Sequence, residues 1–277
     1  MPELPEVETV RLGLDPHLTG RHIERVTPGD FPGVMNGLDI ELASRLLSGR
    51  PFTGTRRRGK YLLFDLDESE TIIIHLRMTG VLTLVKRNDP PERFQRLSIE
   101  LDNGTDLRFS DQRKFGRVTL ASADEIDALM KKLGPEPLSP EFTAEVLRGL
   151  VAKRTAPIKS VLLDQHTIAG LGNIYVDEAL FHAQIHPARI ASTLSLAEIN
   201  LLTEQIKQVL QVGLDHRGTS FSSFRDVYGE KGSNQDQLVV YGRGASGFPC
   251  ARCGAPLQRI IISGRGTSFC PECQRLP

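Results

Sequence analysis

The chain of 277 residues has no apolar run that approaches the roughly 20 residues needed to cross a bilayer, and no apolar signal segment at its N-terminus. These two absences predict a cytoplasmic protein without a membrane partner. The chain also has no excess of one charge, because 34 basic and 34 acidic residues give a formal net charge of 0. Net charge therefore gives no indication of a nucleic-acid partner, and only the distribution of charge along the chain can.

Cysteine is absent from the first 249 residues, and all four cysteines lie in the last 28. Without a secretion signal we do not expect disulfides. The spacing C-x2-C-x16-C-x2-C lets a β-hairpin bring two pairs of thiolates around one tetrahedral zinc ion, although a redox pair or an accidental spacing is an alternative. We predict one structural Zn2+, since four thiolates leave no open position for catalysis. Its ligands are Cys250, Cys253, Cys270 and Cys273.

The first half of the chain begins with a helical pattern, which is followed by a long β pattern. Val7, Val10, Leu14 and Leu18 follow helical spacing, which predicts a helix starting near Pro5. Five short β-rich segments follow, and the stretch DNGT at 102–105 predicts a hairpin turn between the last two. The pattern favours a β-sandwich that carries one N-terminal helix. The predicted strands are 61–66, 71–78, 81–85, 96–101 and 105–110.

Three prolines in GPEPLSP at 134–140 end the β pattern and mark a domain boundary. The period then becomes helical, and Ser195 with Glu198 forms a candidate capping box. The stretch 215–237 is rich in Gly, Ser, Asn and Asp and is long for an ordinary connection, so it is predicted to be a mobile functional loop. Helices are predicted near 141–152, 157–164, 173–183 and 195–214, and domains at 1–134, 135–238 and 239–277.

Basic residues cluster in two places. The segment 50–60 holds five basic residues and no acid, and the segment 231–277 holds six basic and two acidic residues. Solvated surface is the ordinary explanation for such clusters. Lys60 ends the first cluster just before a predicted strand, where a charge can also protect a sheet edge. Arg265 lies between the cysteine pairs in SGRGTS, where glycines allow close backbone approach, and this favours a phosphate contact.

Three further stretches carry chemistry with an ordinary alternative for each. In GLGN at 170–173, Asn173 opens a helix whose free amides can bind an anion, or can simply be capped. Met78 in HLRMTG, and Arg113 and Phe115 in DQRKFG, lie beside turn glycines at strand ends. Met78 and Phe115 could belong to the core, or could act as wedges that enter a DNA stack with Arg113 as a hydrogen-bonding partner.

The opening MPELPEVETV places Pro2, Glu3 and Glu6 ahead of any core element. Removal of Met1 would give Pro2 a free secondary amine, and an α-amine has a pKa near 8, against about 10.4 for lysine. Such an amine is a good nucleophile for imine formation, and two nearby carboxylates suit proton transfer. The same carboxylates also suit a helix N-terminus for dipole reasons alone.

Together these motifs resemble one family over the whole chain, the formamidopyrimidine-DNA glycosylases (Fpg), which are bifunctional base-excision repair enzymes. The resemblance implies an α+β fold in which an N-terminal β-sandwich with a helix is followed by a helix-two-turns-helix domain and a zinc finger. It implies that double-stranded DNA binds in a cleft between the sandwich and the helical domain. It also implies a nucleoid-associated monomer that excises 8-oxoguanine or formamidopyrimidines, with cytosine opposite. The matching stretches are MPELPEVETV, GKYLL, HLRMTG, RKFG, LGPEPL, GLGNIYVDEALF and the four-cysteine finger.

The resemblance also implies residue roles. Pro2 attacks C1′ and forms a Schiff base, Glu3 donates a proton and Glu6 supports the site, after which β,δ-elimination opens the strand. Lys60 and Arg265 have proton-donor roles in the family, but a guanidinium scarcely gives up a proton near neutral pH, so we interpret both as phosphate contacts. The phosphate clamp is Lys60, His75, Asn173 and Arg265; the residues that fill the DNA stack are Met78, Arg113 and Phe115; a further DNA-facing basic set is Lys153, Arg154 and Lys159. The 215–237 loop corresponds to the lesion-capping loop.

The chain departs from many relatives at Arg77, where glycine is common, and at Gln112, where proline is common. Phe94 and Arg96 stand where some relatives have a His pair, so no binding role is assigned to them. None of these positions belongs to the catalytic set. The nearest alternative is endonuclease VIII, a sister enzyme that acts on oxidised pyrimidines. The MPELPE opening and the Arg113–Phe115 pair favour the purine enzyme. A non-catalytic zinc-ribbon DNA-binding protein is an alternative of another class.

Overall fold

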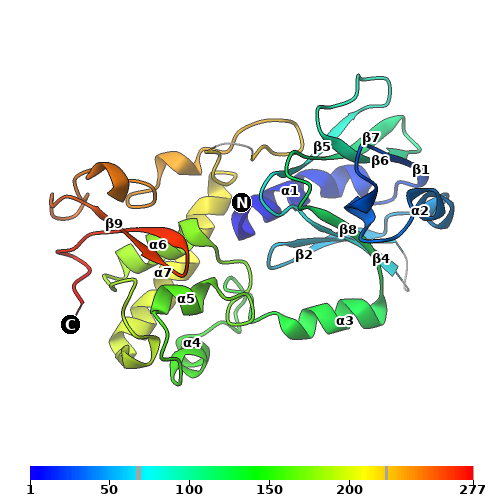
Figure 1. Ribbon diagram of the computed structural model, residues 1–277. Helices are drawn as coiled ribbons and strands as arrows, with labels where there is room; N and C mark the ends of the chain where they lie inside the picture. Colours follow the sequence, from blue (N-terminus) through cyan, green and yellow to red (C-terminus); the bar gives the residue numbers. More distant parts are fainter. Residues whose placement is uncertain (67–69, 222–223, 277) are drawn as a thin grey trace. The chain divides into compact units, whose positions relative to one another are not determined.

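A computed structural model describes residues 1–66, 70–221 and 224–276. The chain forms two compact units, each built from two separate stretches of sequence. The first unit comprises Met1–Lys131 and His216–Gln235, and the second comprises Lys132–Asp215 and Asp236–Pro277. Figure 1 shows the elements of both units in the colours of the sequence. Among the described residues, no helix is long and apolar enough to span a membrane.

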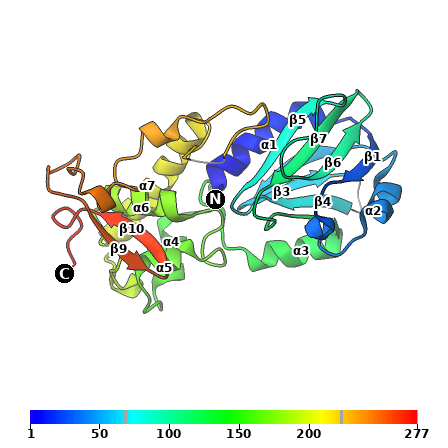
Figure 2. The ribbon, with the colours of Figure 1, turned by 45° about the horizontal axis from the view of Figure 1, so that its top comes forward.

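Two antiparallel sheets of four strands form most of the first unit. The five predicted strands are confirmed within a few residues, and three further strands complete the sheets (Figure 1 and Figure 2). One sheet has the order β1 (Ile23–Pro28), β6 (Gln95–Leu101), β7 (Thr105–Asp111) and β5 (Gly80–Lys86). The other has the order β2 (Gly54–Arg58), β3 (Tyr61–Asp65), β4 (Glu70–His75) and β8 (Arg117–Ser122).

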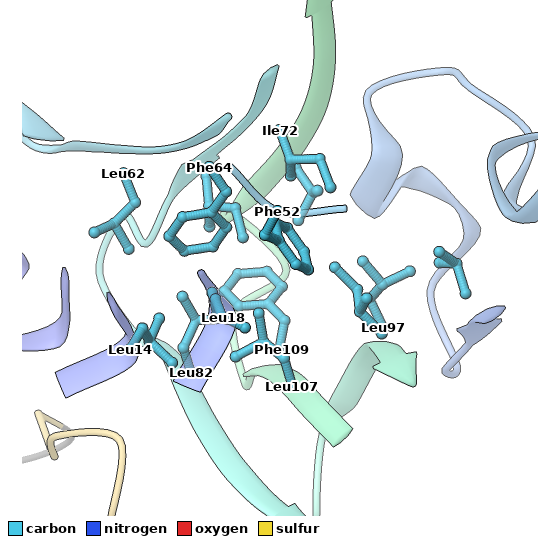
Figure 3. Close-up of a cluster of buried hydrophobic side chains, with 14 of the residues drawn as sticks. Leu14, Leu18, Phe52, Leu62, Phe64, Ile72, Leu82, Leu97, Leu107 and Phe109 are labelled. Carbon is cyan, nitrogen blue, oxygen red and sulfur yellow. The ribbon is translucent and has the colours of Figure 1, made fainter. Parts of the chain in front are cut away.

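The helix α1 (Leu4–Leu18) supplies one face of the core between the sheets. Its predicted apolar stripe is confirmed, because Val7, Val10, Leu14 and Leu18 are each at most 1% exposed. Figure 3 shows Leu14 and Leu18 among side chains from both sheets, such as Phe64 of β3 and Phe109 of β7. Burial of these apolar side chains by two sheets and a helix gives the predicted sandwich.

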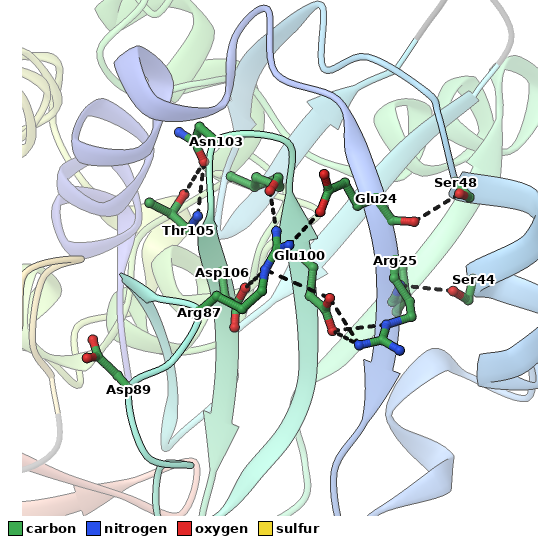
Figure 4. Close-up of polar contacts among 12 residues, drawn as sticks. Glu24, Arg25, Ser44, Ser48, Arg87, Asp89, Glu100, Asn103, Thr105 and Asp106 are labelled. Atoms are coloured by element: carbon green, nitrogen blue, oxygen red, sulfur yellow. Dashed lines mark hydrogen bonds and ion pairs between the residues drawn. The ribbon is translucent and has the colours of Figure 1, made fainter.

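Helix α2 (Ile40–Leu47) packs beside β1 and was not predicted from the sequence. Asp39 caps it by accepting the N–H of Leu42 at 2.9 Å. Two helix serines attach to the strand, because Ser44 Oγ accepts the N–H of Val26 and Ser48 Oγ donates to the carbonyl of Glu24 (Figure 4). The short helix η1 (Pro32–Met35) precedes α2, and α3 (Ala123–Lys132) follows the last strand of the sandwich.

The segment 216–235 belongs to the first unit, whereas the predicted domain 135–238 placed it with the helices. The reason lies in its contacts, because Phe224 and Val227 are part of the core that contains α1. In addition, the N–H of Leu84 in β5 donates to the carbonyl of Val227 at 3.1 Å. Part of the predicted 215–237 loop, residues 222–223, lies outside the described residues.

The second unit is helical and ends in a β-hairpin. All four predicted helices are confirmed, and so is the capping box, since the N–H of Ser195 donates to Glu198 Oε2 at 2.7 Å and the N–H of Glu198 to Ser195 Oγ at 3.3 Å. The helices are α4 (Ala144–Val151), α5 (Ile158–Leu163), α6 (Asn173–His182) and α7 (Leu196–Asp215), with η2 (Ala191–Thr193) and η4 (Gly244–Ser246) as short turns. The short turn η3 (Asn234–Asp236) spans the point in the sequence where the first unit ends and the second resumes. The hairpin is β9 (Gln258–Ile262) with β10 (Arg265–Phe269).

Buried polar side chains attach the C-terminal hairpin region to the helices of the second unit. Glu178 of α6 accepts the three consecutive amides of residues 239–241 at 2.8–3.0 Å. Gln274, which is fully buried, accepts the N–H of Cys270 and donates to the carbonyl of Ile185, each at 2.9 Å. These bonds satisfy backbone groups that would otherwise be buried without partners, so the hairpin region and the helices form one body.

Candidate functional site

Pro2, Glu3 and Glu6 meet at the N-terminus of α1, and all three are buried. Glu3 is the N-cap residue, and it forms a capping box with Glu6. The N–H of Glu3 donates to Glu6 Oε2 at 2.8 Å. The helix-end explanation for these carboxylates is therefore part of the structure. It does not exclude a chemical role, because both carboxylates also lie next to the residue that carries the candidate nucleophile.

Glu6 also ties the start of α1 to the 216–235 segment. Its Oε1 accepts the N–H of Thr219 at 2.7 Å. The adjacent Gly218 has φ of +80°, in the left-handed region, and a Cβ there would lie 2.9 Å from Glu6 Cγ. Glycine is thus required at position 218 both by the backbone conformation and by the space beside Glu6. A predicted loop and a predicted site carboxylate are joined by this contact.

Lys60 lies in the two-residue turn between β2 and β3 and is only 5% exposed. Arg57 connects this turn to α1, because its Nε donates to Glu8 Oε2 at 3.0 Å and its Nη1 to the carbonyl of Gly59 at 3.0 Å. On the neighbouring strand, His75 pairs with Tyr61, and the two rings meet edge-on at 4.6 Å. Lys60 and His75 therefore occupy the same end of β3 and β4, as a shared phosphate contact would need.

The environment of His75 makes its imidazole a neutral hydrogen-bond donor. Burial, with smaller contributions from the positive charges of Arg77 and Lys60, lowers the pKa of His75 to about 3. Its Nδ1 accepts the N–H of Arg77 at 3.0 Å, so the ring proton is on Nε2. Arg77 itself has φ of 55°, in the left-handed region that favours glycine, so this position is one where glycine would be less strained.

Met78, Arg113 and Phe115 lie together on two neighbouring loops of the first unit. Arg113 Nη1 is 3.1 Å from Met78 Sδ, and its guanidinium carbon lies 4.8 Å from the centre of the Phe115 ring. The two apolar members are exposed, by 37% for Met78 and 48% for Phe115. They are therefore not core residues. An exposed thioether and an exposed phenyl ring beside a guanidinium can enter a base stack.

Asn173 and Arg265 are neighbours in the second unit, although 92 positions separate them in the sequence. Asn173 opens α6, and its Nδ2 donates to the carbonyl of Gly266 at 3.1 Å. Arg265 is exposed at the start of β10. The structure thus joins the predicted anion site at the helix start and the predicted phosphate contact of the finger into one basic and amide-rich surface.

Lys159 requires a correction. We predicted it in a DNA-facing basic set, but its side chain is fully buried and pairs with Asp177 Oδ1 at 2.5 Å. Burial raises the pKa of the Asp177 carboxyl, an effect that the Lys159 ammonium opposes. The other Asp177 oxygen accepts the N–H of Ser268 in β10 at 3.1 Å. Lys159 therefore joins α5, α6 and the hairpin, and has no surface to offer a phosphate; Lys153 and Arg154 are exposed.

The four cysteines converge as the spacing predicts. All four sulfur atoms lie within 4.8 Å of one another, with 3.9 Å between the Sγ atoms of Cys250 and Cys273 and 3.5 Å between those of Cys253 and Cys270. Tetrahedral zinc with bonds of 2.3 Å to sulfur requires sulfur separations of about 3.8 Å, so the cluster fits the ion. The amides of Arg252 and Cys273 point to thiolates at 3.4 Å, as expected for a site with negative charge.

Some residues that organise the site were missed in the sequence. Thr79 and Asp111 connect the two loops that carry Met78 and Arg113. Asp177 and Glu178 hold the hairpin region. A signal existed for Asp111, because an aspartate at the end of a strand before a turn commonly accepts turn amides. No local pattern marks Asp177, whose partners lie in α5 and β10.

Three stretches of the chain match known family models. Residues 1–118 match the formamidopyrimidine-DNA glycosylase N-terminal domain, residues 133–225 the formamidopyrimidine-DNA glycosylase H2TH domain, and residues 247–276 the zinc finger found in FPG and IleRS. The chain belongs to the formamidopyrimidine-DNA glycosylase family. The family resemblance inferred from the sequence motifs is confirmed. The finger match and the sulfur geometry together identify a structural zinc site, and the Fpg fold is the predicted α+β arrangement.

Curated Fpg relatives match almost the whole chain. The formamidopyrimidine-DNA glycosylase of Herpetosiphon aurantiacus is 45% identical over 274 residues, covering 99% of this chain and all of the relative. That of Moorella thermoacetica is 48% identical over 262 residues, covering 94% of each chain. Identity at this level over the full length supports a shared fold from the first helix to the finger.

Solved structures of Fpg proteins also match almost the whole chain. A Lactococcus lactis Fpg variant in complex with DNA that contains Fapy-dG has a TM-score of 0.92 and 39% identity, covering 99% of this chain and all of that one. The Lactococcus lactis Fpg with DNA that contains an abasic site gives the same values. MutM in complex with DNA that contains carbocyclic 8-oxo-G has a TM-score of 0.91 and 39% identity. Each of these three neighbours is a complex with DNA that contains a lesion or an abasic site.

Proposed function

We propose that this Fpg protein is a bifunctional DNA glycosylase and AP lyase that excises oxidised purines, 8-oxoguanine and formamidopyrimidines, from double-stranded DNA. The observation that carries the proposal is the meeting of Pro2, Glu3 and Glu6 at the buried start of α1 in a chain of this family. The DNA-bound relatives support the choice of partner. We further propose that the protein acts as a monomer in base excision repair, with cytosine opposite the lesion.

The chemistry begins once Met1 has been removed. An α-amine with a pKa near 8 is about one-quarter neutral at pH 7.5, an upper figure for the more basic proline nitrogen. That nitrogen attacks C1′ of the damaged nucleotide while Glu3 gives a proton to the departing base. The glycosidic bond breaks, the ring opens, and the nitrogen and C1′ form an iminium. Loss of a C2′ proton then expels the 3′ phosphate, and a second elimination expels the 5′ phosphate.

The remaining site residues hold the DNA. We propose that Lys60, His75, Asn173 and Arg265 bind phosphates on the damaged strand, Lys60 and Arg265 as charges and His75 through its Nε2–H. Met78 and Phe115 fill the space that the extruded base leaves, and Arg113 contacts the orphaned cytosine. Lys153 and Arg154 add exposed positive charge. We also propose that the 215–237 loop covers the lesion.

Borohydride trapping tests the chemistry. Duplex DNA containing 8-oxoguanine opposite cytosine is incubated with the protein and borohydride, and peptide mapping locates any covalent adduct. We expect an adduct on Pro2, and expect Pro2→Gly and Glu3→Gln to lose base excision. Mass spectrometry of the intact N-terminus must first show that Met1 is gone, because an acylated Pro2 nitrogen cannot form an iminium.

The same assay separates the alternatives. An endonuclease VIII-type enzyme would cleave thymine glycol in preference to 8-oxoguanine. A non-catalytic zinc-ribbon protein would give no adduct, and Pro2→Gly and Glu3→Gln would change nothing measurable. Adduct formation at any residue other than Pro2 would contradict the proposed mechanism.

A further inference from the structure

Asp111 is the last residue of β7, and its buried carboxylate joins two loops. It is only 1% exposed. One oxygen, Oδ1, accepts the hydroxyl of Thr79, in the loop that carries Met78. The same oxygen accepts the N–H of Arg113 at 3.2 Å, while Oδ2 accepts the N–H of Gly116 at 2.7 Å. Asp111 therefore binds both ends of the loop that presents Arg113 and Phe115.

Thr79 completes the connection between the loops. Its hydroxyl oxygen also accepts the N–H of Arg113, at 3.2 Å. A backbone amide of one loop is thus shared between a side chain of the other loop and Asp111. Hydrogen bonds from amides to a buried carboxylate are charge-assisted and stronger than neutral ones, so this cluster fixes the relative placement of the loops.

The backbone of Asp111 is held from the opposite side by β6. Arg96 Nε donates to the carbonyl of Asp111 at 2.7 Å, and the N–H of Asp111 donates to the carbonyl of Phe94 at 3.0 Å. Arg96 is 2% exposed and lies where the register of β6 against β7 shifts, between Gln95 and Leu97. A bulge of this kind re-aims the strand end and its side chains. Asp111 is therefore an anchored point from which the loops extend.

The loop conformation is one that an unsupported chain would not keep. Lys114, between Arg113 and Phe115, has φ of 60°, which is unfavourable for a lysine. A Cβ on Gly116 would lie 2.4 Å from the Phe109 ring, so the loop also approaches the core closely. Without the bonds to Asp111, the exposed Met78 and Phe115 could adopt other positions. Ordering them on binding would then cost free energy.

We propose that Asp111 is a positioning residue that sets opposite-base selectivity by fixing Met78, Arg113 and Phe115, without contacting DNA itself. This inference rests on the proposed function, in which these three side chains enter the DNA stack. Selectivity depends on where the Arg113 guanidinium is held, and Asp111 controls the backbone on both sides of it. Strand cleavage at a preformed abasic site depends on the amine at Pro2, and we expect it to depend less on Asp111.

The test compares Asp111→Ala with Asp106→Asn, a change of another buried carboxylate on the same strand. Asp106 is 4% exposed and pairs with Arg87 and Arg108, away from both loops. The measured quantity is the ratio of kcat/KM for 8-oxoguanine opposite cytosine to that opposite adenine. We expect Asp111→Ala to reduce the ratio about tenfold, with abasic-site cleavage within about threefold of wild type, and Asp106→Asn to leave both within about threefold.

Thr79→Val serves as the milder variant if Asp111→Ala does not fold, and we expect it to reduce the ratio about threefold. A double variant of Asp111→Ala with Arg113→Ala should have the ratio of Arg113→Ala alone, because both changes act through one guanidinium. An unchanged ratio in the folded variants, an equal loss in Asp106→Asn, or an equal loss of abasic-site cleavage would each overturn the inference. If the wild type excises neither substrate, the proposed function fails instead.

Discussion

At the scale of single residues, His75 makes stability depend on pH in a defined direction. Burial lowers its pKa to about 3, whereas an unfolded histidine titrates near 6.5. Between these values the unfolded chain binds a proton that the native state does not, so the free energy of unfolding falls as pH falls from 6.5 toward 3. The native state keeps this histidine neutral down to about pH 3.

We predict that His75→Asn reduces this loss. An asparagine oxygen can accept the Arg77 amide, but it does not titrate. Between pH 7.5 and pH 5.5 the wild type should lose about 1 kcal/mol more stability than the variant. Urea unfolding at both pH values measures the difference, with His22→Asn, a change at an exposed ring, as the control. Equal losses in wild type and His75→Asn would contradict the assignment.

Lys159 gives a second prediction at this scale. Lys159→Met leaves the buried Asp177 carboxylate without its ammonium partner, and such changes cost about 3 to 5 kcal/mol. Adding Asp177→Asn should restore part of the loss, because the uncompensated charge disappears while an acceptor for the Ser268 amide remains. Urea unfolding measures each variant. Lys153→Met, at an exposed position of the same sequence cluster, should stay within about 0.5 kcal/mol of wild type.

At the scale of elements, the zinc finger is expected to depend on its metal. Among the described residues its only regular elements are β9, β10 and the short η4, so the finger has little core of its own. A chelator, or Cys273→Ser, should therefore increase amide hydrogen exchange in residues 258–269. Exchange in β3 and β4 of the sandwich should not change, since no finger residue belongs to that core. Unchanged exchange in the hairpin of the zinc-free protein would contradict this.

The elements that could be predicted are those with a strong local pattern. The stripe from Val7 to Leu18 and the strands 61–66 and 105–110 carry their own periodicity, and all were found. Helix α2 was missed because its eight residues fall between a turn-rich stretch and the basic cluster, and its stability comes from Asp39 and from contacts with β1. Strand β2, GTRRR, has a charged sequence that forms a strand because α1 and β3 bind both of its sides.

The candidate site divides in the same way. Pro2, the four cysteines, and the Met78 and Arg113 motifs could be named from sequence, because each has a local spacing or sits in a recognisable motif. The burial of Lys159 could not be predicted, since its partner Asp177 lies 18 positions away and Gly266 lies 107 away. Long-range pairing decides whether a lysine is a surface charge or a buried ion pair, and spacing does not encode it.

At the scale of the whole molecule, a chain of zero net charge has to bind DNA through local clusters. The salt dependence of binding then reports how many charges contact phosphates. For duplex DNA, the logarithm of Kd rises with the logarithm of the salt concentration with a slope of about 0.9 per phosphate contact. We predict that Arg265→Ala reduces the slope of log Kd against log salt by about 1, whereas His75→Asn leaves it unchanged, because a neutral imidazole releases no counterion. Fluorescence anisotropy over a salt series measures both.

A network of arginine–carboxylate ion pairs on the sandwich provides the control for the measurement of the salt slope. Arg87 pairs with Glu24 and Asp106, and Arg25 pairs with Glu100, so these arginines are already neutralised by carboxylates (Figure 4). Arg25→Ala should therefore leave the salt slope of DNA binding at the wild-type value. A slope reduced equally in Arg25→Ala and Arg265→Ala would contradict the proposed phosphate contact of Arg265.

The two-stretch composition of the first unit has a consequence for synthesis of the protein. Its core includes Phe224 and Val227, and β5 hydrogen-bonds to Val227, so the sandwich lacks part of its interior until most of the polypeptide has been translated. Proteins usually fold domain by domain as the ribosome advances. Here the helices of the intervening stretch emerge before the earlier sandwich can be completed, and a nascent chain stalled near residue 134 would expose apolar surface to chaperones.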